Sequence, residues 1–507
     1  MIWALLLVPA VAGLTALAIR PNGPRRLWLL LAAVTHAALV TACCVRRPPS
    51  VAHGWMAIDA VALLFLGVTA VLFLVVAIYT VGYLARDGHA GGVSGSHAES
   101  PFPSFPNFPE AVFTSCLLLF LATMTWVMVS RHLGLLWVAV EATTLASAPL
   151  IYFHRHPRSL EATWKYLLIC SVGIALALLG HFFVAVAARS AGGGPIHLTI
   201  DELSMHAESL NPLWLKAAFL FLLVGYGTKM GLAPLHTWLP DAHSEAPSGV
   251  SALLSGALLN CAFLAILRAH TLLSDAGLGE FSSDLLVLFG LISMAVAAVF
   301  ILGQADYKRM LAYSSVEHMG ILALGVGIGG VATFGAMLHV VNHSLTKAML
   351  FLAAGNILAF YRTKSTRHVR GVLRCLPVTG VLWLAGFLAI VGSPPFGLFL
   401  SELTILQGMI DAGRPLVAVL YLLALAVVFI GMATIFMHMA YGRPTETPEP
   451  GGPSSVGREG ESPAPREPFW STAPVLLLGL GVLVLGVYVP PGLTDLLHQA
   501  VAAFGVK

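Results

Sequence analysis

The stretch MLHVVNHSLTKAMLFL, residues 337–352, is almost wholly apolar yet carries His339, His343 and Lys347. Residues four positions apart lie on one face of an α-helix, so these three side chains would form a line about 12 Å long at about 1.5 Å of rise per residue. The stretch therefore predicts an apolar helix with a row of proton-binding groups along one face.

The composition of the whole chain places that helix in a membrane. Hydrophobic residues make up 58% of the 507 residues and charged residues 10%, whereas soluble domains contain about 25% charged residues. Mean hydropathy is +0.86. We therefore predict an all-α, polytopic integral membrane protein. The net charge of +3 reflects its topology and gives no reason to expect a nucleic-acid partner.

Apolar stretches near 20 residues long predict about fourteen transmembrane helices. They lie near 2–19, 27–45, 57–84, 111–129, 133–152, 164–187, 213–239, 249–267, 284–303, 309–328, 331–360, 376–410, 417–440 and 471–489. The first stretch has no positive segment before it and is followed by many further spans, so we interpret it as a retained helix and not as a cleaved signal peptide.

Lysine and arginine are distributed unevenly between the predicted loops. Seventeen follow odd-numbered helices, and seven follow even-numbered ones, namely Arg46, Arg47, Arg131, Arg189, Lys216, Arg268 and Arg414. Positive loops favour the cytoplasmic side. Both termini are therefore predicted on the non-cytoplasmic side of a bacterial-type cytoplasmic (inner) membrane.

Two patterns that can bind cofactors lack the context they need. The six cysteines are scattered through apolar segments without a C-x-x-C pair, so neither an iron–sulfur cluster nor a structural zinc site is predicted. GVGIGG, residues 325–330, fits G-x-G-x-x-G but joins two membrane helices instead of following a strand. We expect no cofactor in this chain.

Four ionisable residues lie inside predicted spans: Glu141, Lys229, Lys347 and Glu402. A charge near the bilayer centre costs from roughly 2.5 to over 10 kcal/mol, so such residues are functional candidates. A packing ion pair, or a lysine that reaches the interface, is the structural alternative for any one of them. This structural alternative explains four buried charges of both signs less well than it explains a single one. A Glu and a Lys that approach and separate can instead form a proton switch.

Two of these charges lie beside Gly/Pro interruptions: Lys229 in KMGLAPLHTWLP of helix seven, and Glu402 after VGSPPFG in helix twelve. Broken membrane helices mark the ion path of transporters. We therefore predict broken helices seven and twelve within two inverted five-helix repeats, at 111–268 and 269–441. The remaining units are helices one to three at 1–85, a Gly/Pro/Ser-rich loop at 86–110, a polar Pro/Gly-rich linker at 442–470, and helix fourteen with its tail at 471–507.

The histidines of the opening stretch complete the proton-binding set. Neutral imidazole accepts a proton on one nitrogen and donates from the other, so His339 and His343 with Lys347 predict a proton relay. A zinc site is the alternative to a proton relay, because two histidines spaced H-x-x-x-H can bind zinc. However, HVVNH lacks the Glu of H-E-x-x-H, and Lys347 would oppose a bound cation. We expect no metal site.

Three longer motifs carry a family resemblance. GTKMGLAPLHTWLPDAHSEAPSGVSALLSG (227–256), QADYKRMLAYSSVEHMG (304–320) and HSLTKAMLFLAAGNI (343–357) closely resemble the antiporter-like membrane subunits of respiratory complex I, Mrp-type cation/proton antiporters and membrane-bound hydrogenases. The resemblance covers roughly residues 110–440. Within that family, VEATTLASAPLIYFHR (140–155) is most similar to the hydrogenase-4 component F type.

The resemblance implies roles for individual positions. It assigns proton transfer to Glu141, Lys229, His339, His343, Lys347 and Glu402, and possible accessory places to His236, Asp241, His243, His318 and Asn260. The glutamate of helix five and the lysine of helix seven would form a changing ion pair, helix eleven the central relay, and helix twelve the exit. Asn260 stands where many pumping members have a lysine, so either water or a neighbouring His bridges that gap, or transport is weaker or differently routed.

The function implied is proton translocation by a non-catalytic membrane subunit of a redox-driven complex, of the NADH:quinone oxidoreductase or group 4 hydrogenase type. Its expected partners are other membrane subunits and a peripheral redox module, and iron–sulfur clusters, flavin or Ni–Fe are expected only on those partners. An Mrp-type cation/proton antiporter subunit and the membrane partner of an inorganic-carbon uptake system are the alternatives. A purely structural membrane anchor explains the buried charges poorly.

Overall fold

The computed structural model describes residues 1–90, 110–189, 197–443 and 467–504, and its regular elements are helices with four isolated β-bridges. The first part of the chain forms α1 (Ile2–Ala16), α2 (Asn22–Val45), α3 (Ala60–Ala90), α4 (Glu110–Val129), α5 (Leu133–Ile151), α6 (Pro157–Arg189), α7 (Ile200–Met205), the 3₁₀ turn η1 (Ala207–Ser209), α8 (Pro212–Met230), α9 (Trp238–Glu245), α10 (Ser248–Leu253), the π-helical turn η2 (Leu254–Leu258) and α11 (Leu259–Asp275). The second part forms α12 (Gly279–Ile301), α13 (Tyr307–Ile328), α14 (Gly330–Tyr361), α15 (Val372–Cys375), α16 (Pro377–Ile390), α17 (Gly397–Asp411), α18 (Pro415–Tyr441), α19 (Phe469–Val487) and α20 (Pro491–Ala502).

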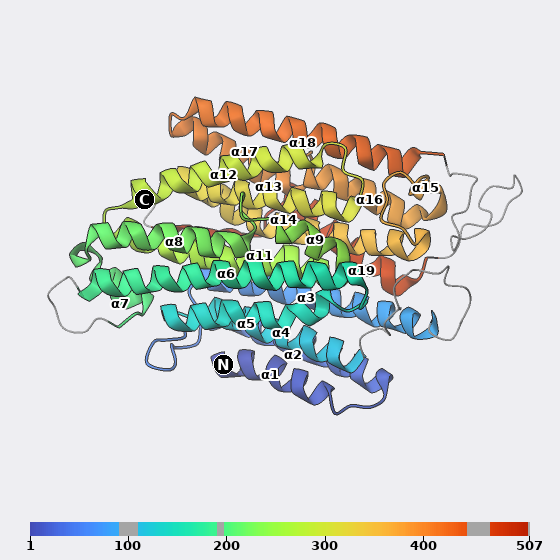
Figure 1. Cartoon of the computed structure of the whole chain (residues 1–507), viewed down its shortest axis with the longest axis horizontal. Coiled ribbons are helices and arrows are strands. Elements are labelled where there is room, and N and C mark those ends of the chain that lie inside the picture. The colour runs from blue at the N-terminus through green and yellow to red at the C-terminus, as the bar shows by residue number, and fades with distance from the viewer. Residues whose placement is uncertain (91–109, 190–196, 444–466, 505–507) are drawn as a thin grey trace, which may run out of the picture.

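The long helices run side by side along the longest axis of the molecule, with α1 and α2 at one edge and α18 at the other (Figure 1). Within the described residues, twelve helices are long and apolar enough to cross a membrane, and α1 and α16 are shorter apolar helices. The predicted all-helical membrane fold is confirmed. The number of spans and the two five-helix repeats remain predictions. Most of the two linkers, at 86–110 and 442–470, lies outside the described residues.

Helices α11 and α14 form the centre of this bundle. The continuous helix from α10 to α11 is buried along its whole apolar window, whereas most of α18 is exposed to the surroundings of the bundle. The exposed side chains of α18 are large and apolar, such as Leu423 and Ile430. A helix that is apolar on every face and lies at the rim of a bundle is suited to contact with lipid.

Both predicted helix breaks are present. Helix α8 ends at Met230, where Gly231 adopts a left-handed conformation with φ +85°, and the chain resumes as α9. The second break separates α16 from α17. There, Gly392 adopts φ +64°, a left-handed conformation that favours glycine, and lies against the carboxylate of Glu402. Each break therefore lies beside one of the predicted intramembrane charges.

Several helix boundaries differ from the sequence prediction. The span predicted at 164–187 begins earlier, at Pro157 of α6, and the span predicted at 249–267 continues to Asp275 of α11. The longer α11 buries Arg268, which donates to the backbone oxygens of Met128 and Ser130 at the end of α4. Carbonyl groups at a helix C-terminus carry partial negative charge and can satisfy a buried guanidinium. Arg268 is therefore part of the bundle and not of a loop.

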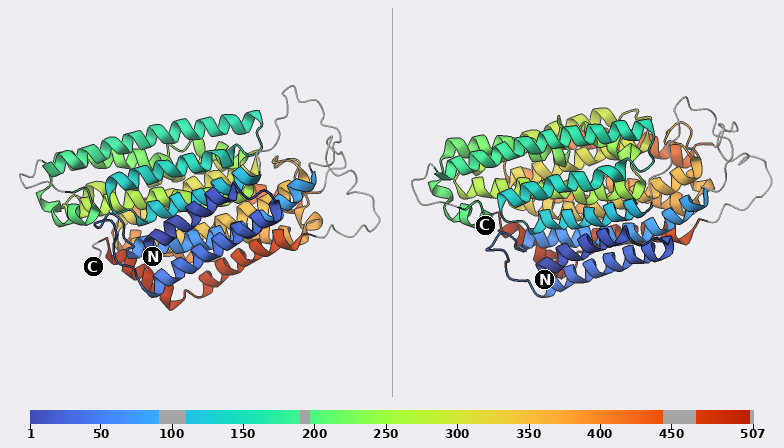
Figure 2. Two further views of the ribbon diagram at one scale, coloured as in Figure 1. Left: turned by 90° about the horizontal axis from the view of Figure 1, so that it is seen from below. Right: turned by 60° about the horizontal axis from the view of Figure 1, so that its bottom comes forward.

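The C-terminal segment returns to the N-terminal helices. Helices α19 and α20 both pack against α3, and α19 also packs against α14. Figure 2 shows these last helices beside the first ones. The short helix α20 was not predicted, because its twelve residues are too few to span a membrane and mix polar with apolar side chains.

Candidate proton-transfer chain

Lys229 lies in the last turn of α8, directly before the break, and its side chain is fully buried. Its ammonium donates to Thr144 Oγ1 at 2.7 Å and to the Tyr166 hydroxyl at 2.6 Å. It also lies 4.5 Å from the centre of the Tyr166 ring, within cation–π distance. Hydroxyl groups and a ring face therefore solvate this charge in place of water.

Glu141, on α5, is bridged to that lysine by a hydroxyl group instead of bonding to it directly. One carboxylate oxygen accepts from Ser171 Oγ at 2.8 Å and the other from Thr144 Oγ1 at 3.4 Å. Thr144 therefore stands between the predicted pair, because its oxygen also accepts from Lys229. Glu141 is only half-buried, so one end of this cluster reaches the surface of the chain.

Lys347, near the middle of α14, is fully buried and donates to the Leu311 carbonyl at 2.7 Å and to Ser314 Oγ, both on α13. Glu317, one to two turns further along α13, is 2% exposed and interacts electrostatically with Lys347. Sequence reasoning missed Glu317, although it lies within the predicted span 309–328. The test that selected the other four intramembrane charges would have found it.

Three histidines cluster beside this lysine, across two helices. His318 Nδ1 and His339 Nε2 are 3.0 Å apart, and His339 Nδ1 lies 3.0 Å from Ser401 Oγ on α17. The His343 ring centre is 5.0 Å from that of His318, and neither of its nitrogens has a hydrogen-bond partner among the described residues. The hydrogen bonds therefore connect α13, α14 and α17, whereas the sequence predicted a line along α14 alone.

Glu402, in the first turns of α17, closes this cluster. The ligating atoms of His318, His339 and Glu402 lie within 4.8 Å of one another, so they are the described residues that could hold a metal ion. Two of these ligands are already hydrogen-bonded to each other. A metal bound to either of these two nitrogens would replace that hydrogen bond. One oxygen of Glu402 has no hydrogen-bond partner among the described residues and can accept one.

Asn260 links α11 to α14 by hydrogen bonds. From α11 its side-chain nitrogen donates to the Gly256 carbonyl at 2.8 Å and to Ser344 Oγ on α14 at 2.9 Å. One turn away, Ser255 and Ser315 are hydrogen-bonded at 2.8 Å. The π-helical turn η2 lies directly before Asn260, and such turns occur often at functional sites. An amide and hydroxyls provide hydrogen bonds here, but no group that titrates near neutral pH.

The remaining accessory candidates separate into two groups. His243 is buried and stacks on Phe351 with ring centres 5.1 Å apart, and neither of its nitrogens is bonded within the described part of the chain. His236 lies against Tyr313. Asp241 instead accepts from Lys165 at 2.9 Å and from Arg309 at 2.6 Å, both partly exposed. Asp241 is therefore part of an ion-pair cluster at the end of the bundle.

The chain matches known membrane subunits over most of its length. Residues 130–429 match the family described as NADH:quinone oxidoreductase/Mrp antiporter, transmembrane. The hydrogenase-4 component F homolog of Methylacidiphilum infernorum is 36% identical over 440 residues, which is 86% of each chain. A chain of respiratory complex I from Thermus thermophilus is 25% identical with a TM-score of 0.74, covering 96% of this chain and 97% of that one. A chain of the Mrp complex from Dietzia sp. is 22% identical with a TM-score of 0.81, covering 100% and 97%.

Proposed function

Because the chain belongs to the NADH:quinone oxidoreductase/Mrp antiporter family and is an antiporter-like membrane subunit, we propose that it translocates protons within a redox-driven complex. Its residues would bind, hold and release protons. Electron transfer would take place on partner subunits that carry iron–sulfur clusters, flavin or Ni–Fe. The relatives belong to complex I and hydrogenase-4 assemblies, which supports membrane and redox partners of that kind.

One observation carries this proposal: two buried lysines, Lys229 and Lys347, each have a glutamate and a hydroxyl group within the same cluster. A buried charge without water needs such partners. A lysine on a flexible four-carbon stem can exchange a hydroxyl partner for a carboxylate, and each exchange changes its affinity for a proton. A conformational change that moves Lys229 between Thr144 and Glu141 would therefore drive proton uptake or release.

The second cluster supplies the onward route. A proton leaving Lys347 can pass to the histidine cluster, where His318 and His339 already share a hydrogen bond, and then to the unpartnered oxygen of Glu402. Imidazole accepts and donates on different nitrogens, which suits it to this transfer. Asn260 and Ser344 would order the hydrogen bonds between the two clusters, and the proton itself would cross that gap on water.

The test compares two lysines on one helix. The complex is purified with its partner subunits, reconstituted into liposomes and driven by its electron donor, while a pH-sensitive dye reports proton movement. Lys229→Met removes the buried ammonium, and Lys216→Met removes one near the start of α8 that lies over the Phe281 ring. Loss of a charge-assisted hydrogen bond is worth about 1.5–3 kcal/mol, so we expect at least about a tenfold loss of pumping rate for the first variant. The second should stay within about twofold of wild type.

Undiminished pumping by an assembled Lys229→Met complex would remove Lys229 from the route. A second arm of the test omits the electron donor and imposes a Na⁺ or K⁺ gradient. Proton movement in that arm alone would identify a cation/proton antiporter subunit, as in the Mrp complex, in place of a redox-driven pump.

A further inference from the structure

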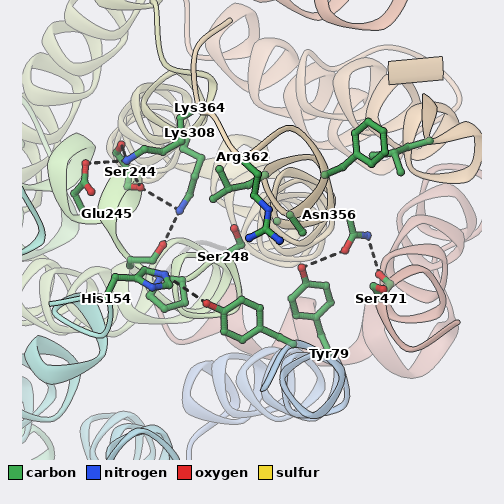
Figure 3. A pocket seen from close by; sticks show the side chains of 18 of the residues that line it. Tyr79, His154, Ser244, Glu245, Ser248, Lys308, Asn356, Arg362, Lys364 and Ser471 are labelled. Carbon is green, nitrogen blue, oxygen red and sulfur yellow. Dashed lines mark hydrogen bonds and ion pairs between the residues drawn. The ribbon is translucent and has the colours of Figure 1, made fainter. Parts of the chain in front are cut away.

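A cavity of about 430 Å³ opens at the end of the bundle where α9 ends and α13 and α19 begin. Its walls come from α3, the end of α14 and the first turn of α19, and its rim from the loops that hold His154 and Lys364 (Figure 3). Most of its lining is apolar, with charged groups gathered at one side. Cavities of this size and character bind small molecules or parts of larger ones.

The charged side of the cavity has an excess of cations. Lys364 is neutralised by Glu245 at 2.8 Å. Lys308 is buried, and in the described part of the chain it donates to the backbone oxygens of Ser244 at 3.3 Å and Ala246 at 2.6 Å and interacts electrostatically with Asp306 and Glu245. Arg362 has no ion pair or side-chain hydrogen bond within the described part of the chain, and Figure 3 shows its guanidinium projecting into the cavity.

One positive charge remains after the carboxylates are counted, because Lys308, Arg362 and Lys364 line the cavity together with Glu245 and Glu467. Both oxygens of Glu467 accept from the start of α16, through the backbone nitrogen and hydroxyl of Thr379. Burial, with the nearby charge of Lys308, lowers the pKa of His154 to about 4, so its ring is neutral at pH 7. The lining therefore carries one net positive charge, and it presents the guanidinium of Arg362, which has no ion pair among the described residues, to whatever enters the cavity.

Aromatic side chains place the cavity at the depth of lipid headgroups. Phe469 and Trp470, next to the lining residues Pro468 and Ser471, are 69% and 57% exposed. Exposed Trp and other amphipathic aromatic residues gather at the membrane–water interface. The excess of Lys and Arg in the loops after odd-numbered helices predicts that this end of the bundle is cytoplasmic, where membranes carry anionic lipid.

We propose that this cavity binds the phosphate headgroup of an anionic phospholipid, with Arg362 as the principal ligand and Lys308 as a second positive charge. A guanidinium matches two phosphate oxygens at once, and an ammonium adds a point charge. Basic pockets between membrane helices are recognised sites for such headgroups. The apolar lining would contact the glycerol and the start of the acyl chains. This site is independent of the proposed proton transfer.

Native mass spectrometry of the full-length protein in mild detergent tests the proposal. Phosphatidylglycerol is added at rising concentration to wild type, Arg362→Gln and Arg367→Gln, with phosphatidylcholine as the neutral lipid. Arg367 is the matched control, because it is exposed on the same connection after α14 but does not line the cavity. We expect one phosphatidylglycerol to be retained by wild type and Arg367→Gln, and retention to fall about tenfold in Arg362→Gln, as loss of a bidentate charged contact implies.

A further variant and a further ligand distinguish binding of the lipid headgroup from binding of free phosphate and from nonspecific retention. Arg362→Lys keeps the positive charge but not the two parallel donors of the guanidinium. Intermediate retention of phosphatidylglycerol by this variant would support a phosphate held through two oxygens. Equal retention of phosphatidylglycerol by all variants, or equal retention of phosphatidylcholine, overturns the site. Inorganic phosphate is added in a separate series. If it binds to wild type but phosphatidylglycerol does not, the ligand is free phosphate and the lipid assignment is wrong. None of these measurements depends on pumping.

Discussion

The two buried lysines sit in clusters of different depth. Lys229 is bonded to two hydroxyl groups, and its glutamate, Glu141, is half-buried and one hydroxyl away. Lys347 is bonded to a backbone carbonyl and a serine, and its glutamate, Glu317, is almost completely buried. The same three components, a lysine, a hydroxyl and a glutamate, are therefore used once near the surface of the chain and once in its interior.

Because the two clusters differ in burial, we expect loss of one member to affect transport and stability differently in each. The half-buried carboxylate of Glu141 keeps part of its solvation, so the first cluster can lose its lysine without leaving a bare charge inside the bundle. In the second cluster each charge is compensated from within, and removal of one partner strands the other. The first cluster should therefore be sensitive in transport, and the second in both transport and stability.

The largest effect is expected for Lys347→Met. Breaking a buried pair by removing one partner typically costs about 3–5 kcal/mol, because the remaining charge has no compensation. We expect thermal unfolding in detergent to shift clearly downward, together with loss of pumping. In Lys347→Met/Glu317→Gln the stranded carboxylate is also removed, so at least half of the lost stability should return while pumping stays absent.

The single variant Glu317→Gln is the control for that pair, and Glu280→Gln, at the start of α12, is the control for loss of a glutamate elsewhere. If the double variant melts as low as Lys347→Met, the two charges are not coupled. The contrast in depth between the two clusters would then have no energetic consequence.

A smaller effect is expected for Thr144→Val, which removes the hydroxyl between Lys229 and Glu141 with little change of volume. This hydroxyl is hydrogen-bonded to both charged groups, and such a bond is worth about 1.5–3 kcal/mol, so pumping should fall at least about tenfold while the melting temperature changes less than in Lys347→Met. Thr143→Val is the matched control, because the Thr143 hydroxyl donates to the Val140 carbonyl of its own helix. Equal rates in the two variants would show that the bridge is not part of the route.

The helical membrane fold could be predicted from sequence because it depends on length and apolarity alone. The same is true of the two breaks, since Gly and Pro next to a charge are visible as letters. The ends of helices were less predictable. An arginine after an apolar stretch, such as Arg268, predicts the end of a span. In the structure this side chain instead donates to carbonyl groups of α4 inside the bundle, about 140 positions earlier in the chain. Such long-range compensation leaves no local signal.

The candidate site was predictable residue by residue but not in its connections. The spacing of His339, His343 and Lys347 gives their common helix correctly, but the hydrogen bonds run sideways to His318 and Ser401. Which face of α13 and α17 meets α14 is decided by packing. A pattern along one helix therefore identifies the members of a cluster, while the order in which they are bonded requires the fold.

The smallest effect is expected for Asp241→Asn, because Asp241 lies outside both lysine clusters. Its partners Lys165 and Arg309 are nearly half exposed, and such ion pairs contribute about 0–1 kcal/mol. We expect pumping within about twofold of wild type, and a small loss of stability at low ionic strength that disappears in 1 M salt, where exposed charges are screened beyond about 3 Å. Melting temperatures at the two salt concentrations and the pumping rate measure this. A tenfold loss of pumping in a variant of normal stability would instead make Asp241 a member of the route, and would extend the shallower cluster from Lys229 through the break between α8 and α9 to the end of the bundle.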